Sequence, residues 1–320
     1  MYSVPPTYSM PSMSPQPMSL SQILDETFSL YRRNFSTFAA IAVFMALPGL
    51  VLSLMLTALT LSDLTTHIQD LERELARGRI QDPSELLPLL QPFLSLGAVS
   101  LIISALDFFV FRSLGEAASA IGVRDAYAQQ ASAGTALAEA LRRIVPLVIW
   151  ALLLSLIVLV PLLLLGLVVA AMIINEGSAF RVLFCLLLPL WPIVFLYLGI
   201  KLIFGSRVIA LEGAGISQAW SRSWQLTKGA FWRVVGVTLA ISILVAVLST
   251  IIGGVAGLVP ALLIGDSLAG SIISSALSAI VGALIAPITY IGITLLYYDL
   301  RRQHDWAAQA PAEMYPGRLS

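Results

Sequence analysis

The chain has 320 residues, of which 58% are hydrophobic and 11% are charged, whereas an average soluble domain is about 25% charged. With a mean hydropathy of +0.91, this composition predicts a protein of the lipid bilayer and excludes an ordinary soluble enzyme. The formal net charge is zero, so no overall positive field would attract nucleic acid. The single cysteine, Cys185, lies in an apolar run. We therefore interpret it as a small buried hydrophobic residue and not as a reactive thiol.

The N-terminal residues predict a tail followed by an amphipathic helix. Residues 1–18 are rich in Pro, Ser and Met, carry no charge, and lack the pattern of a secretory signal, so we expect a disordered tail. Ser19 and Gln22 form a capping-box pattern that begins a helix. Apolar residues then follow at helical spacing: Leu20, Leu24, Phe28, Tyr31 and Phe35. Arg32 and Arg33 face away, and the apolar run from Phe38 favours a helix on the membrane surface over one in a soluble core.

Six apolar stretches are long enough to cross a bilayer, which takes about 20 helical residues. They lie near residues 38–61, 93–111, 144–174, 182–204, 234–264 and 268–297. The predicted fold class is therefore all-α and polytopic, with a helical membrane domain over 19–302 and a second tail over 303–320. An even number of crossings places both termini on one side.

The positive residues predict which side that is. Of the 18 lysines and arginines, only Arg73, Arg77, Arg79 and Arg181 fall on the side away from the termini. Since positive residues are retained in the cytoplasm, both termini are predicted to be cytoplasmic in a prokaryotic plasma membrane. Residues 62–91 would then lie outside, as a short charged helix that caps the bundle or rests on the headgroups.

The segment 215–237, GISQAWSRSWQLTKGAFWRVVGV, combines aromatic and basic residues before an apolar run. Such side chains suit the headgroup layer. Together with the N-terminal helix they form a predicted interfacial belt: Phe28, Arg32, Arg33, Trp220, Arg222, Trp224, Lys228, Trp232 and Arg233. The same pattern occurs around residues 21–35 and, more weakly, at 135–143 (TALAEALRR). We therefore predict three internal repeats, each a surface helix followed by two crossings.

Two further patterns lie inside the crossings. Small residues recur every four positions in the last crossing: Gly270, Ser274, Ser278, Gly282 and Ala286. Such a stripe favours close helix packing over a pore or gate. Charged residues lie toward the cytoplasmic ends as a candidate ion or headgroup site: Asp107, Arg112, Lys201, Arg207, Glu212 and Asp299. The favoured interpretation is a ring of interfacial ion pairs. A more specific one is that Asp107 belongs to a site for a proton, a cation or a lipid headgroup, and a catalytic role is the least favoured.

Three segments together resemble a known family: SLSQILDETFSLYRRNF, RVIALEGAGISQAWSRSWQLTKGAFWRVVGV and ITLLYYDLRR. The sequence is similar to an uncharacterised prokaryotic family that resembles the membrane domain of glycerophosphoryl diester phosphodiesterases. The resemblance implies a polytopic helical domain in the plasma membrane, fused in some relatives to a soluble catalytic domain. That catalytic domain needs His and several metal-binding carboxylates. With only His67 and His304 present, on opposite predicted sides, no catalytic residue can be transferred.

No nucleotide-binding, zinc-protease or serine-hydrolase motif occurs in the sequence, so we expect no cofactor, metal or catalytic role. The leading hypothesis is a non-catalytic integral membrane protein that interacts with lipids or assists other membrane proteins, and not with nucleic acid. One alternative is a small transporter or channel with a site near Asp107. The other is an intramembrane lipid-modifying enzyme.

Overall fold

A computed structural model describes residues 16–76, 97, 100, 110–157, 190–264 and 268–309, and throughout these residues the chain is helical with no strand. The short helices are α1 (Leu20–Arg33), α4 (Arg112–Tyr127), α5 (Ala133–Arg142), α9 (Gly205–Glu212) and α10 (Ile216–Thr227). The apolar ones are α2 (Phe35–Ala76), α8 (Leu190–Leu202), α11 (Phe231–Leu248), α12 (Gly254–Ile264) and α13 (Leu268–Gln309). A π-helical turn, η2 (Ser249–Gly253), joins α11 to α12.

Four stretches of the described residues are long and apolar enough to cross a membrane: Phe35–Leu52, Ile193–Glu212, Phe231–Ile264 and Ile272–Asp305. A fifth arises if α5 and the helix Ile144–Ile157, bent by 73° at Arg143, are taken as one span. The predicted integral membrane class is therefore confirmed. Most of the predicted crossing at 93–111, parts of those at 144–174 and 182–204, and residues 1–15 of the predicted tail lie outside the described residues, so six crossings and three repeats stay predictions.

The helix α1 begins and ends where local chemistry dictates. The Ser19 hydroxyl accepts from the Gln22 amide (3.3 Å), and the Gln22 side chain accepts from the Ser19 amide (2.8 Å), which confirms the capping box. After Asn34 the chain begins α2. The buried side of α1 carries Ile23, Thr27 and Leu30. The apolar stripe predicted from Leu20 and Phe28 is therefore the neighbouring, exposed side of the helix, with 41% and 40% exposure.

Two long helices run past the boundaries that the sequence predicts. No glycine or proline occurs between Leu61 and Ala76, so α2 continues as one helix into the segment that was expected to form a separate outer helix. Likewise, α13 continues to Gln309, beyond the point where a tail was predicted to begin at residue 303. A helix of 42 residues is about 63 Å long, so both extend well beyond a hydrocarbon core of about 30 Å.

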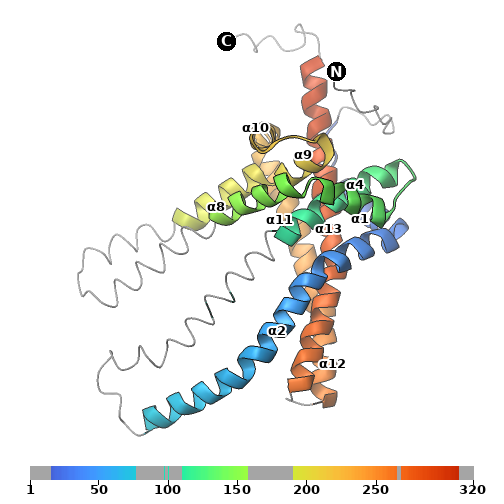
Figure 1. The fold of residues 1–320 in the computed structure, drawn as a ribbon. Helices are drawn as coiled ribbons and strands as arrows, with labels where there is room; N and C mark the ends of the chain where they lie inside the picture. The colour runs from blue at the N-terminus through green and yellow to red at the C-terminus, as the bar shows by residue number, and fades with distance from the viewer. Residues whose placement is uncertain are drawn as a thin grey trace, which may run out of the picture.

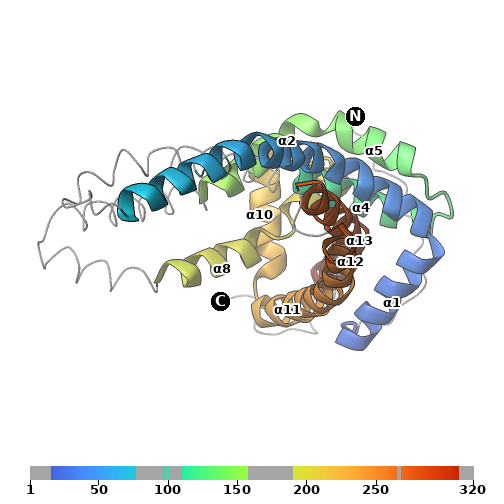
Figure 2. The same cartoon turned by 90° about the horizontal axis from the view of Figure 1, so that it is seen from below.

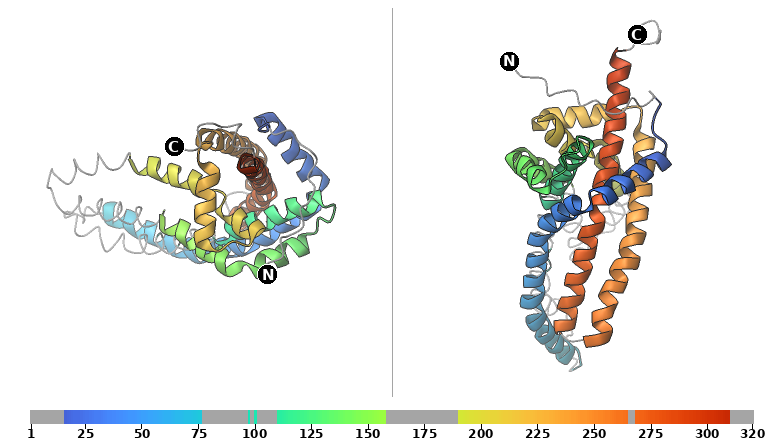
Figure 3. Two further views of the ribbon diagram at one scale, coloured as in Figure 1. Left: turned by 90° about the horizontal axis from the view of Figure 1, so that it is seen from above. Right: turned by 90° about the vertical axis from the view of Figure 1, so that its right-hand side faces the viewer.

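The short helices gather around the C-terminal half of α13 and form what we call the short-helix layer: α1, α4, α5, α9 and α10 (Figure 1). The side view shows α2 and the α12–α13 hairpin extending away from this layer (Figure 3). Seen along that direction, α1, α2 and α4 surround α13 on one side and α11 lies on another (Figure 2).

The buried core lies mostly in the short-helix layer and at the adjoining ends of the long helices. It includes most of α4, the whole of Gly205–Ala210 in α9, and α13 from Ile291 to Leu300. By contrast, Leu262 and Leu263 on α12 are 82% and 80% exposed. Apolar side chains exposed on membrane-crossing helices face acyl chains, so they need no protein partner.

The side chain of Tyr31 joins α1 to α13 in the turn before Pro287. Pro287 cannot donate a backbone hydrogen bond, so the carbonyl four residues earlier, that of Ala283, loses its helical amide donor. The Tyr31 hydroxyl donates to the next carbonyl, that of Leu284, at 2.5 Å. This contact fixes α1 to that turn of α13.

Candidate functional site

The charged residues in and around the short-helix layer form separate clusters, the first of which centres on Glu116. Its carboxylate accepts from Ser206 Oγ (2.7 Å), Arg207 Nη1 (3.1 Å) and Arg112 Nε (3.2 Å). Arg207 is fully buried, and its Nη1 also donates to the carbonyl of Ile203 (2.7 Å). The contacts join α4 to α9 across 91 residues of sequence.

The surroundings of Glu116 keep it ionised. Burial by itself would raise the pKa of this carboxyl, but the charges of Arg207 and Arg112 and the hydrogen bond from Ser206 outweigh it and lower the pKa. Glu116 thereby balances a guanidinium that has no access to water. Within the described chain, Nε and Nη2 of Arg207 are buried without a hydrogen-bond partner.

A second cluster centres on Asp299 of α13, whose side chain is fully buried. It accepts from the Met18 amide (3.3 Å), Arg302 Nη2 (2.9 Å), Gln303 Nε2 (2.9 Å) and Arg233 Nη2. Arg233 also donates to the Met18 carbonyl at 2.9 Å. Asp299 therefore ties the residue before α1 and the first turn of α11 to α13.

The third cluster surrounds Glu212 at the end of α9. Tyr297 of α13 donates its hydroxyl to this carboxylate at 2.5 Å, and the Nε atoms of Arg222 and Arg301 lie 3.6 and 3.7 Å from it. Arg222 also pairs with Asp305 at 3.2 Å. Four oppositely charged side chains and a tyrosine thus link α9, α10 and α13.

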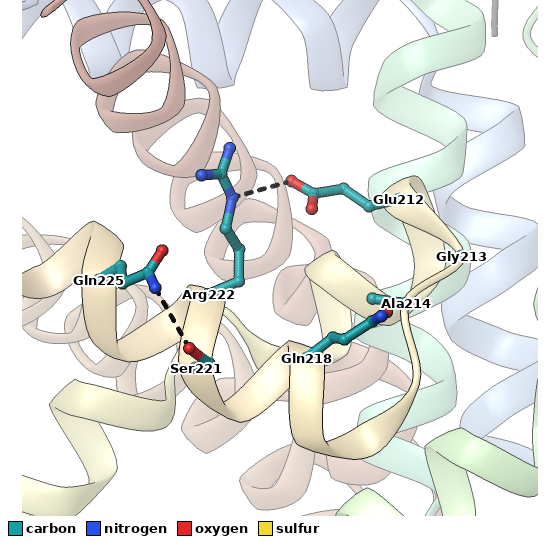
Figure 4. Close-up of a pocket in the computed structure, with 7 residues that line it drawn as sticks. All are labelled: Glu212, Gly213, Ala214, Gln218, Ser221, Arg222 and Gln225. Atoms are coloured by element: carbon teal, nitrogen blue, oxygen red, sulfur yellow. Dashed lines mark hydrogen bonds and ion pairs between the residues drawn. The ribbon is translucent and has the colours of Figure 1, made fainter. Parts of the chain in front are cut away.

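A pocket of about 350 Å³ opens beside the Glu212 cluster, at the turn between α9 and α10 (Figure 4). Its lining is Glu212, Gly213, Ala214, Gln218, Ser221, Arg222 and Gln225. The polar groups there already bond to one another: Gln225 Nε2 donates to Ser221 Oγ (3.2 Å), and Gln218 Oε1 accepts from the Gly215 amide (3.4 Å). The pocket therefore presents no unpaired charge to a ligand.

The end of α9 is fixed by a glycine and an arginine. Gly213 has φ = 68°, a left-handed conformation that suits glycine and ends the helix. The Gly213 amide donates to the carbonyl of Ile209 (3.2 Å), and Arg143 Nη1 donates to the same carbonyl (2.7 Å) and to that of Ala210 (2.5 Å), so a positive charge lies at the C-terminal end of α9. Arg124 of α4 holds Glu139 of α5 through two bonds of 3.0 and 2.6 Å.

Lys201 lies apart from these ion pairs, near the end of α8. It is 7% exposed, and its Nζ faces three aromatic rings, with distances to the ring centres of 5.1 Å for Trp224, 5.7 Å for Tyr197 and 5.8 Å for Phe231. These distances are within the range of cation–π attraction, which extends to about 6 Å. We call this arrangement the Lys201 cup.

In the structure, some residues of the predicted belt are exposed and others contact the rest of the protein. Trp232 is 81% exposed, Phe28 40% and Trp220 37%, and Arg32, Arg33 and Lys228 are also exposed. Trp224 is half-buried in the Lys201 cup, while Arg222 and Arg233 bind the carboxylates described above. The two groups occur on the same helices, so each helix has one side toward the core and one toward its surroundings.

The predicted small-residue stripe of α13 contacts α12 and η2 over part of its length. Ser278 Oγ donates to the Gly253 carbonyl (3.3 Å) and lies 2.9 Å from where a Cβ on Gly257 would be. Gly270 is buried, Ser274 Oγ is buried without a hydrogen-bond partner among the described residues, and Ala286 is half-buried. A Cβ on Gly282 would meet nothing within 4 Å, so close helix packing does not extend to that position.

The predicted charged site is not one site. Asp107 lies outside the described residues. Arg112 and Arg207 come together, but through Glu116, which the sequence analysis missed. Lys201, Glu212 and Asp299 belong to three different groups. The spacing of Arg112 and Glu116, four apart on a helix, is the one local signal that indicated a pair. No group of three His, Cys, Asp or Glu side chains able to hold a metal occurs among the described residues.

Comparison with known proteins identifies the part of the chain that includes α8 to α13. Residues 171–312 match the membrane domain of glycerophosphoryl diester phosphodiesterase. The resemblance found in the sequence is thereby confirmed for this part of the chain. No curated protein and no solved structure matches the sequence. The membrane-domain match covers the Lys201 cup, Asp299 and the Glu212 pocket, whereas Glu116 lies outside it.

Proposed function

We propose that the protein is a non-catalytic membrane module whose short-helix layer lies among phospholipid headgroups on the cytoplasmic side of the plasma membrane. The observation that carries this proposal is the exposure of aromatic side chains beside basic ones on the layer and on the adjoining start of α11, where Trp232 at 81% is the clearest case. In water such a ring would be poorly solvated, whereas the headgroup layer accommodates an indole together with nearby positive charge.

The direction of the exposed residues supports the same placement. The start of α11 exposes Trp232 four positions after exposed Lys228, and α1 exposes Leu20 and Phe28 close to exposed Arg32. The buried sides of both helices are fixed to α13 through Asp299 and Tyr31. The layer therefore presents a fixed apolar and basic surface, which is what a lipid-binding surface requires.

The experiment measures the thermal stability of delipidated protein in detergent after adding either a phospholipid or a diacylglycerol with the same acyl chains. We expect the phospholipid to raise the unfolding temperature and the diacylglycerol to do so much less, because ligands that bind the folded state stabilise it. Trp232→Ala should reduce the difference. The matched control is Leu262→Ala, whose side chain is equally exposed, at 82%, but lies on α12. Equal stabilisation by both lipids in the native protein would rule out headgroup binding.

The proposed orientation is tested separately. In a Cys185→Ser background, Ser217→Cys on α10 should react with a membrane-impermeant maleimide only after the cells are opened. Labelling in intact cells would place the short-helix layer on the outer side.

A further inference from the structure

Lys201 differs from the arginines of the charged clusters in what balances its charge. Arg207, which is fully buried, and Arg233, which is partly exposed, each lie within hydrogen-bond distance of a carboxylate. Among the described residues, no oxygen forms a hydrogen bond or ion pair with Nζ of Lys201, and its contacts are the three aromatic rings. An ammonium group has three donors, and a nearly buried one without an oxygen acceptor is costly.

The aromatic rings position this ammonium without cancelling its charge. Cation–π attraction to Trp224, Tyr197 and Phe231 offsets part of the loss of water. A carboxylate partner would neutralise the group, but the rings carry no net charge. The cup therefore holds a full positive charge with unused hydrogen-bond donors, which is the arrangement an anionic ligand needs.

The backbone around Lys201 is fixed, so the position of the cup is built into the fold. Ser223 of α10 donates its hydroxyl to the Lys201 carbonyl at 2.7 Å, and the same hydroxyl accepts from the Phe204 amide at 3.3 Å. Ser223 is fully buried. The end of α8 is thus held against α10.

The cup lies at the edge of the layer that the exposed aromatic residues mark. Tyr197 is 42% exposed, and Phe231 packs against Trp232, the most exposed aromatic side chain of the belt, with ring centres 5.5 Å apart. Exposed Lys228 lies just before Phe231 in the chain. A headgroup beside Trp232 would therefore have its phosphate close to the level of the cup.

We propose that Lys201 binds the phosphate of a phospholipid headgroup, with Tyr197, Trp224 and Phe231 holding the ammonium in place. This inference rests on the proposed function and names the residue that binds the headgroup phosphate. Phosphate oxygens supply the acceptors that the ammonium lacks, and lysine binds phosphate as a point charge. A free phosphate ion offers the same chemistry, so the test has to distinguish the two sources.

The test counts phospholipid molecules retained by detergent-purified protein with native mass spectrometry, during titration with a phosphatidylglycerol of defined chains. Lys201→Gln should weaken this binding by at least about tenfold, because it removes the charge from the hydrogen bond to the phosphate. Lys201→Arg should retain most of it, since arginine keeps both the charge and the attraction to aromatic rings. Arg142→Gln, which removes an exposed charge at the end of α5 and outside the predicted belt, is the matched control. Thermal unfolding of each variant, followed by circular dichroism, checks that the fold is intact.

A competition with inorganic phosphate separates the sources. If phosphate at millimolar concentration leaves the lipid bound, the ligand is the lipid headgroup; if it displaces the lipid, the site takes phosphate from either source, and both results support the assignment. Lipid binding by Lys201→Gln equal to that of the native protein would overturn the role of Lys201 while leaving the proposed function intact. Failure of the native protein to retain any phospholipid would overturn both.

Discussion

Replacement of Gly205 by alanine tests the packing that holds α9 inside the short-helix layer. A Cβ at this position would lie 1.9 Å from Cζ2 of Trp150, whereas carbon atoms in contact are about 3.5–4.0 Å apart. The indole cannot move aside easily, because Trp150 is 1% exposed and packs edge-on against Trp220 with ring centres 6.3 Å apart. Overpacking of a well-packed core costs about 1–3 kcal/mol, and a displacement this large belongs at the upper end. We therefore expect Gly205→Ala to lower the free energy of unfolding by about 3 kcal/mol.

The measurement is an unfolding titration of the detergent-solubilised protein with SDS, followed by circular dichroism. Gly199→Ala is the control, since a Cβ on Gly199 of α8 would meet no atom within 4 Å. It should be neutral or stabilising by up to about 1 kcal/mol, the helix-propensity difference between glycine and alanine. Trp150→Phe, added to Gly205→Ala, should recover part of the loss because the smaller ring leaves room. Equal stability of the two glycine variants would show that Gly205 is not packed against Trp150.

Three further predictions concern the carboxylates. Glu116→Gln should cost about 3–5 kcal/mol in the same titration because it leaves the buried Arg207 without a counter-charge, and adding Arg207→Met should restore part of that stability. Asp299→Asn should speed limited proteolysis just before α1, detected by mass spectrometry, because the residue preceding α1 is bonded to this carboxylate; unchanged cleavage would contradict this. The hydrogen bond from Arg124 lowers the pKa of Glu139 below its ordinary 4.5. The stability from this pair is therefore complete above that value and lost as the pH falls through the lower folded-state pKa, so Glu139→Gln should flatten the acid side of a stability–pH profile.

The sequence predicts the parts of this fold that depend on neighbouring residues. The capping box at Ser19 and the apolar runs that begin α2 and α11 are local signals, and the structure confirms the helices they indicate. The end of α1 at Asn34 was not predicted, because the apolar stripe continues through Phe35. By contrast, α4 and α9 were missed. Their composition resembles the polar end of a membrane-crossing helix, and nothing local shows that α9 is buried on all sides.

The charged clusters could not be predicted from local sequence either, because they join residues that are far apart in the chain. Asp299 and Arg233 are 66 residues apart, and Arg207 and Glu116 are 91 apart, so their pairing depends on how the long helices bring the layer together. Sequence spacing placed Asp299 beside Arg302, three positions on, and that contact is present at 2.9 Å. It could not show that Lys201 would have aromatic neighbours in place of a carboxylate.

The short-helix layer is more buried than the long helices because one is surrounded by water and headgroups and the other by hydrocarbon. In hydrocarbon, apolar side chains gain little by contacting one another, so the exposed faces of α11 and α12 cost almost nothing. At the end of the spans, where water enters, the same chemistry favours a packed apolar core around Trp150 and Tyr297. Buried carboxylates such as Glu116 and Asp299 then fix which helices meet, because only one arrangement gives each charge its partners. A lysine held there by uncharged rings is the exception to that rule, and this is why Lys201 is the position where a ligand is expected to supply the missing partner.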